Sequence, residues 1–164
     1  MTDGVLVVGY GNGLRSDDGI GRLVAERLAD DPRLAGATVL SLHQLVPELA
    51  VDISRASLVV LIDAAHGLPP GSFTIERVGA AAQPAATWSH QLGPASLVAL
   101  ANELYGQSAE VALVSVGVES VDVGDRLSPV VAAAMPRVIQ AVADLVAGRV
   151  APVAAVSAGG HGRA

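Results

Sequence analysis

The sequence predicts a single α/β domain, a sandwich in which a mostly parallel, twisted sheet is flanked by helices on both faces. Short runs rich in valine, isoleucine and leucine alternate with segments whose apolar residues recur at helical spacing, and this alternation is typical of βαβ units. The runs are apolar throughout, which predicts strands buried on both faces, as in a parallel sheet. A length of 164 residues, 51% of them hydrophobic, fits one domain with a substantial core.

The first strand and helix form the first half of a βαβ unit. Residues 5–8 are a strand-like run that ends at Gly9, and a glycine-rich loop follows. From Asp18 onward, apolar residues at helical spacing predict a helix as far as Leu28. Carboxylates stand at the start of this helix, where they favour the positive end of the helix dipole.

The same alternation continues to the end of the domain. Further strands are expected at residues 38–42, 58–62 and 111–116, with an edge strand at 72–76. Further helices are expected at residues 47–54, 93–106 and 128–147, each of the last two with proline near its start and glycine at its end. Pro136 should kink the last helix. Residues 79–89 are predicted as a loop, residues 1–149 as the domain, and residues 150–164 as a flexible C-terminal tail.

Composition excludes several classes of function. A net charge of −6, with no lysine and scattered arginines, argues against a nucleic-acid-binding surface. No secretory signal and no apolar stretch of membrane-spanning length is evident, so we expect a cytoplasmic protein with no membrane partner. The absence of cysteine excludes disulfides, thiolate metal sites and cysteine nucleophiles, so nitrogen and oxygen atoms must hold any metal.

The loop at residues 9–19 is the first candidate for chemistry. Its glycines partly match a dinucleotide-binding turn, but Leu14 stands where that fingerprint needs glycine, and His43 stands where an acidic residue would hold the ribose. Adjacent carboxylates would also repel a phosphate. The alternative is that Asp17 or Asp18 faces the crevice at the carboxyl ends of the strands, where open α/β sheets bind their ligands.

Asp63 and His90 are the other candidates. Asp63 ends the most apolar strand, so it should emerge at the same sheet edge as Asp18, although an aspartate there can equally be a turn former. His90 lies just before the helix that Pro94 opens, and a lone loop histidine is more often a surface residue than a ligand. One imidazole and two carboxylates would suit nickel, zinc or iron(II), with positions left open for a partner's groups.

The remaining histidines are weaker candidates for a functional site, and the standard catalytic motifs are absent. His43 either lines the crevice or packs at a helix start, whereas His66 should be solvated and His161 lies in the tail. The chain has no Gly-x-Ser-x-Gly elbow, no His-Glu-x-x-His helix and no phosphate-binding Gly-Lys-Ser/Thr loop. Common serine hydrolases, zincins and P-loop enzymes are therefore poor fits.

Taken together, these segments resemble the hydrogenase maturation protease family. The resemblance covers residues 4–148 in order and rests on Val-Gly-Tyr-Gly-Asn-Gly-Leu-Arg-Ser-Asp-Asp-Gly-Ile-Gly at 8–21, residues 43–49, Leu-Ile-Asp-Ala at 61–64, Ser-His at 89–90, and Gly-Asp-Arg-Leu-Ser at 124–128. Residues 43–49 depart from the Asp-Gly-Gly-Thr type of loop in better-known members. This variant resembles the branch that serves cytoplasmic, NAD(P)-linked or related soluble hydrogenases.

The resemblance implies an endopeptidase that removes the C-terminal extension of a [NiFe]-hydrogenase large-subunit precursor after nickel insertion. Carried over by position, the residues that contact the substrate's nickel and act in catalysis are Asp18, Asp63 and His90, with Asp17 as a further possible proton acceptor. Residues expected to bind substrate are Gly11, Asn12, His43, Gln44 and Glu48. The nickel would come with the precursor, no organic cofactor is implied, and the protein is expected to act as a monomer.

Two other functions remain open at this point. A non-catalytic nickel chaperone would use the same three residues to pass metal to the hydrogenase, and it would release no peptide. A nucleotide-binding oxidoreductase domain would instead use the glycine-rich loop, and a dinucleotide titration would reveal it.

Overall fold

The structure, a computed structural model, describes residues 4–79, 92–106 and 109–152 and confirms the predicted α/β fold. The five-stranded sheet has the order β2-β1-β3-β5-β4. Four strands run parallel, and β4 pairs antiparallel with β5 at one edge. The strands are β1 (Val5–Tyr10), β2 (Thr38–Leu42), β3 (Leu58–Ala65), β4 (Phe73–Arg77) and β5 (Glu110–Gly117).

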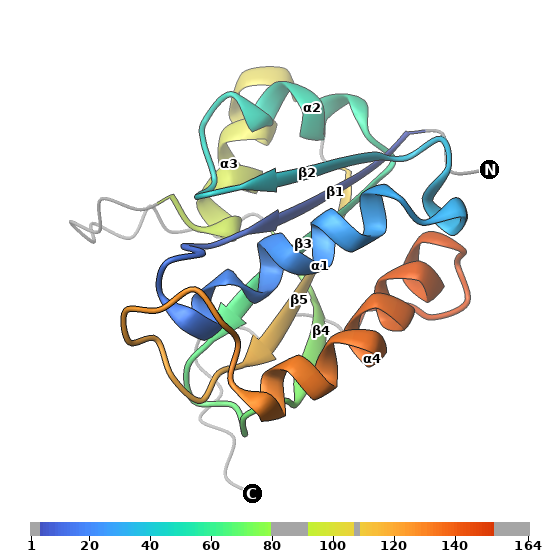
Figure 1. Cartoon of the computed structure of the whole chain (residues 1–164). Coiled ribbons are helices and arrows are strands. Elements are labelled where there is room, and N and C mark those ends of the chain that lie inside the picture. Colours follow the sequence, from blue (N-terminus) through green and yellow to red (C-terminus); the bar gives the residue numbers. More distant parts are fainter. Residues whose placement is uncertain (1–3, 80–91, 107–108, 153–164) are drawn as a thin grey trace, which may run out of the picture.

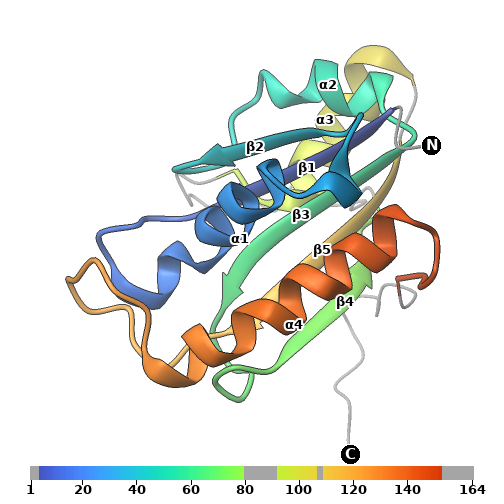
Figure 2. The ribbon, with the colours of Figure 1, turned by 45° about the vertical axis from the view of Figure 1, so that its right-hand side comes forward.

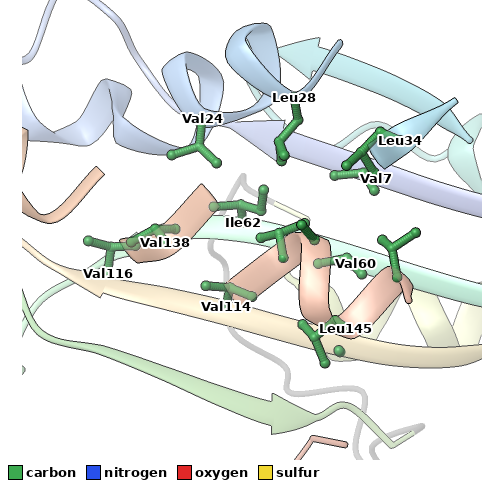
Figure 3. Close-up of a cluster of buried hydrophobic side chains, with 14 of the residues drawn as sticks. Val7, Val24, Leu28, Leu34, Val60, Ile62, Val114, Val116, Val138 and Leu145 are labelled. Atoms are coloured by element: carbon green, nitrogen blue, oxygen red, sulfur yellow. The ribbon is translucent and has the colours of Figure 1, made fainter. Parts of the chain in front are cut away.

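Helices cover both faces of this sheet, as Figures 1 and 2 show from two directions. They are α1 (Ile20–Ala29), α2 (Leu49–Arg55), α3 (Pro94–Tyr105) and α4 (Pro129–Val146), with short 3-10 turns η1 (Ser16–Gly19) and η2 (Pro32–Leu34). One core lies between the sheet and α1 with α4, where Val24, Ile62 and Val138 meet (Figure 3). A second core lies on the opposite face, where residues of α2 and α3 pack against β1, β3 and β5.

Three strands are longer than the sequence predicted, and the extensions of β1 and β3 reach the site. β1 continues past Gly9 to Tyr10, which pairs with Leu42, and β3 continues past Ile62 to Ala65. Asp63 therefore lies within the strand, in register with Ser115 of β5, and does not simply follow it. Pairing with β5 through Ala65 holds the end of β3 extended and fixes the direction of the Asp63 side chain.

Helix α4 corrects the expectation that no stretch has membrane-spanning character. It is 18 residues long with a mean hydropathy of 1.4, which would suffice by length and composition alone. One stripe of this helix, including Val131, Val138 and Val142, is fully buried in the core against the sheet. Its apolar character therefore reflects a core position. The helix continues through Pro136, and residues 153–164 of the expected tail lie outside the described part of the chain.

Two glycines let α1 lie directly on the strands that carry the site. A Cβ on Gly21 would collide with the carbonyl oxygen of Ile62, and one on Gly9 would collide with the carbonyl oxygen of Gly21. These neighbours are backbone atoms, which cannot rotate away as a flexible side chain would. The start of α1 is thus fixed close to the ends of β1 and β3.

Gly21→Ala should therefore destabilise the protein by about 1–3 kcal/mol or more, because the added methyl group forces two backbone segments apart. Without that collision, replacing a helical glycine by alanine would stabilise by up to about 1 kcal/mol, so the sign alone is informative. Urea denaturation measures the change. Gly13→Ala is the control, because a Cβ there meets only the Arg22 guanidinium at 3.8 Å. A Gly21→Ala protein as stable as the wild type would contradict the close-packing account.

Candidate active site

A cavity of about 330 Å³ opens at the carboxyl ends of β1, β2 and β3. Six of the residues singled out in the sequence line it: Gly11, Asn12, Asp18, His43, Gln44 and Asp63. Asp18 comes from the loop after β1, His43 and Gln44 follow β2, and Asp63 is near the end of β3. The structure thus brings the two aspartates to one cavity from separate segments, at the edge where parallel sheets bind ligands.

Asp18 is held by a tight loop that doubles back on the end of β1. The backbone N–H of Asn12 donates to Asp18 Oδ2 at 2.7 Å. Gly11 has a φ of +148°, and a Cβ there would collide with the carbonyl oxygen of Asp18. Only glycine permits this close approach at such a backbone conformation. The glycines of the loop therefore serve to position a carboxylate.

Asp63 is oriented by a tyrosine that the sequence reasoning did not identify. The Tyr10 hydroxyl donates to Asp63 Oδ2 at 3.0 Å, and Tyr10 is buried at the end of β1. Burial raises the pKa of Asp63 to about 6, with a smaller raising effect from the charge of Asp18. The hydrogen bonds from Tyr10 and the Ala64 backbone, and the charge of His66, act in the opposite direction and lower this pKa. Burial and the same carboxylate raise the pKa of Tyr10, so it stays a neutral donor.

Asp17 has a different position from its neighbour. Its side chain is fully buried and does not line the cavity. Its carboxylate accepts hydrogen bonds from the backbone N–H groups of Glu119 (2.9 Å), Ser120 (3.0 Å) and Ser128 (2.7 Å), and from the Ser128 hydroxyl (2.7 Å). Burial alone would raise the pKa of Asp17, but these four hydrogen bonds outweigh it and lower the pKa. Asp17 therefore ties η1 to the segment that leads into α4.

Six further residues line the cavity without having been predicted to, and three of them carry polar side chains. Tyr10, Arg15 and His66 line it together with the predicted residues. His66 is exposed, as expected for a solvated residue, and it also faces the site. Arg15 is exposed at the rim, where its Nε donates to the Val121 carbonyl oxygen at 3.1 Å. His66 follows Asp63 closely and was expected only to be solvated, although residues just beyond a parallel strand commonly lie at the ligand-binding edge.

The two remaining predicted site residues have different outcomes. Glu48 is exposed at the start of α2 and does not line the cavity. His90 lies outside the described residues, so its predicted role stays a prediction. Within residues 4–79, 92–106 and 109–152, no three His, Cys, Asp or Glu side chains form a group that could hold a metal ion. Asp18 and Asp63 are the two carboxylates that open toward the shared cavity, which His43 and His66 also line.

Comparison with known proteins agrees with this architecture. A family model, the HycI hydrogenase maturation protease, matches residues 23–145, which is well over half of the chain. Because the match begins at residue 23, Asp17 and Asp18 lie before it. No curated protein sequence matches the chain.

Solved structures of maturation proteases share the fold. The [NiFe] hydrogenase maturation protease HycI from Thermococcus kodakarensis is 24% identical, with a TM-score of 0.69 over 87% of this chain and 92% of that one. The hydrogenase 2 maturation peptidase from a Thaumarchaeota archaeon is 24% identical, with a TM-score of 0.67 over 87% and 97% of the two chains. HybD from E. coli is 22% identical, with a TM-score of 0.67 over 88% and 93%. The family match and the shared fold show that this chain belongs to the hydrogenase maturation protease family.

Proposed function

We propose that this protein is a nickel-gated endopeptidase that removes the C-terminal extension of a [NiFe]-hydrogenase large-subunit precursor. The observation that carries the proposal is the cavity that Asp18 and Asp63 share, in a chain of the maturation protease family. The nickel is part of the substrate, held by the precursor near its extension. The protease acts in the cytoplasm, where it meets the precursor as a monomer.

The donor set fits a metal that arrives with most of its ligands already in place. Asp18 and Asp63 offer carboxylate oxygens, which suit nickel only as part of a mixed shell, and among the described residues no three His, Cys, Asp or Glu side chains form a metal-binding group. A resident metal needs a more complete set of protein ligands. An incomplete set of protein ligands has little affinity for a free metal ion. Its affinity for the ion increases when the precursor supplies the other ligands. In this proposal His90 is the third ligand.

The surrounding hydrogen bonds prepare the two carboxylates for this contact. The Asn12 N–H and the Tyr10 hydroxyl each bond the Oδ2 atom of one aspartate, at 2.7 and 3.0 Å. Partners of this kind orient metal-binding groups and tune their basicity. Partial burial of Asp63 also limits competition from water. When the loaded precursor is bound, its nickel can polarise the scissile carbonyl or activate a water molecule, so recognition and cleavage depend on the same ion.

The pH dependence should report the state of Asp63. A carboxyl with a raised pKa is ionised above about pH 6 and protonated below it, and only the ionised form attracts the metal. We expect kcat/KM for the nickel-loaded precursor to fall as pH decreases through about 6. Tyr10→Phe removes a hydrogen bond that lowers this pKa, so the acid limb should move to higher pH. An acid limb with the same midpoint in both proteins would contradict the role of this pair.

Incubation of purified protein with nickel-loaded precursor tests the proposed activity. Mass spectrometry should show a shortened large subunit and one released C-terminal peptide. An intact precursor whose nickel content changes would instead indicate the chaperone function. The dinucleotide alternative is tested in parallel by titrating NAD, for which no binding is expected.

A further inference from the structure

A second cavity, of about 310 Å³, lies beside the first and shares Asn12 and His43 with it. Nothing in the proposed chemistry uses it. Its other walls come from the loop after β1, from α1 and from the segment before α4, and they include Leu14, Leu23 and Asp125. The volume is at the lower end of the range for sites that enclose small ligands, which suits one or two side chains of a peptide.

Exposed apolar residues stand in the wall of this cavity and next to it. Leu14 is 70% exposed, and Val123 on the adjoining loop is 92% exposed. Single exposed apolar residues are ordinary, but these two stand on paired segments beside a cavity that Leu23 also lines. The blue loop after β1 and the orange loop before α4 run side by side in Figures 1 and 2. We call Leu14, Leu23 and Val123 the apolar ledge.

Hydrogen bonds fix the two loops of the ledge to each other. The Gly124 N–H donates to the Leu14 carbonyl oxygen at 2.9 Å, and the Ser16 N–H donates to the Gly124 carbonyl oxygen at 2.9 Å. The Ser16 hydroxyl also donates to the Asp122 carbonyl oxygen at 2.7 Å. Buried Asp17 holds the following turn. A ledge held in this way loses little conformational entropy when a partner covers it.

We propose that the apolar ledge and the second cavity bind an apolar segment of the hydrogenase precursor, next to the part that carries the metal. The inference rests on the proposed function and deepens it, because it assigns a binding subsite to the same substrate. The shared residues Asn12 and His43 place the two cavities side by side, so an extended chain that leaves the first cavity can continue along the surface to the second. Apolar side chains of the precursor segment would pack against Leu14 and Leu23. The polar side chains of Arg22, Glu26 and Asp125 around these leucines can form hydrogen bonds with the backbone of the segment.

Substitution of Leu14 separates this docking role from catalysis. The Leu14 side chain is mostly exposed, and the loop contacts of this residue use its backbone, so Leu14→Asp should leave the fold and the position of Asp18 unchanged. Leu104→Asp is the matched control, because Leu104 is 59% exposed on α3 and lines neither cavity. Leu23→Gln is a second variant inside the cavity. Equal melting temperatures for all proteins confirm that they are folded.

With nickel-loaded precursor, Leu14→Asp should raise KM about tenfold or more and leave kcat within about twofold, while Leu104→Asp leaves both unchanged. Leu23→Gln should raise KM in the same direction. An unchanged KM in Leu14→Asp and Leu23→Gln would overturn the docking role.

If the wild-type protein releases no peptide, the proposed function fails, and titration calorimetry with the uncut precursor then decides the docking role. A tenfold weaker Kd for Leu14→Asp supports it, whereas an equal Kd, or no wild-type binding, overturns it.

Discussion

Asp18→Asn should reduce processing of the nickel-loaded precursor by about a hundredfold or more and leave the protein folded. The substitution removes the negative charge that faces the cavity but retains a carbonyl oxygen that can accept the Asn12 N–H. Changes in groups that merely support metal ligands typically cost 10- to 100-fold, so loss of a direct ligand should cost at least as much. Initial rates of peptide release, measured by mass spectrometry, give the ratio.

The control for this experiment is Asp30→Asn, which makes the same chemical change at an exposed position after the end of α1. It should process the precursor at the wild-type rate. Asp63→Asn should behave like Asp18→Asn, because the two carboxylates share one cavity. Full activity of Asp18→Asn would show that Asp18 is not a ligand of the substrate's nickel and would contradict the proposed pair of carboxylate ligands.

Asp17→Ala should instead lose stability, by roughly 3 to 5 kcal/mol. Three backbone N–H groups and one hydroxyl would lose their acceptor inside the protein, and each unsatisfied buried donor costs about 1–3 kcal/mol before the structure relaxes. A loss of this size is a large share of the total stability of an ordinary domain. Urea denaturation at neutral pH measures it, with Asp18→Ala as the matched neighbour, for which a change of less than about 1 kcal/mol is expected.

The pH dependence of stability provides a check on the same residue. The pKa of Asp17 is lower in the folded protein than in the unfolded chain, so its contribution is fully present above the unfolded value of about 4 and is lost as pH falls through the folded value. Wild-type protein should therefore lose stability in acid more steeply than Asp17→Ala. Parallel acid-denaturation profiles for the two proteins would show that Asp17 is not the anchor described.

The structural role of Asp17 could not be predicted from the sequence. Both aspartates stand at the start of a helix, and the family resemblance assigned the metal contact to Asp18 but gave Asp17 only a possible role as a proton acceptor. Their roles diverge because the backbone donors around residues 119–128 meet Asp17 from more than a hundred positions away along the chain. No local pattern encodes that contact. The structure leaves Asp18 as the carboxylate of this pair that faces the cavity.

The contact between Tyr10 and Asp63, by contrast, was within reach of sequence reasoning. β1 and β3 are adjacent and parallel, with Gly9 paired to Ile62, so Tyr10 and Asp63 come next in register. Alternation along each strand places both on the face of the second core, after Val8 and Leu61. The pair was missed because the first strand was predicted to end at Gly9. In the structure, the backbone hydrogen bonds of β1 with its neighbours continue through this glycine.

The fold could be predicted from the sequence, because apolar spacing and helix-capping residues are local signals. β2 has the predicted limits, and α3 begins at Pro94 and ends at Tyr105, before Gly106 in a left-handed conformation. β1, β3 and β5 are extended by one to three residues at an end, where pairing with neighbours outweighs local preference, and β4 is shifted by one residue. The shape of the cavity depends on loops whose positions are set by long-range hydrogen bonds, and these leave no periodic signal.

The most direct test of the central claim compares nickel-loaded and nickel-free forms of one precursor in the same cleavage assay. If Asp18 and Asp63 contact the nickel of the substrate, the loaded form should lose its C-terminal peptide and the nickel-free form should stay intact over the same time. Adding nickel to the nickel-free form until it is loaded should restore cleavage. Equal rates of cleavage for the two forms would contradict the account, because cleavage would then not depend on contact between the two carboxylates and the nickel.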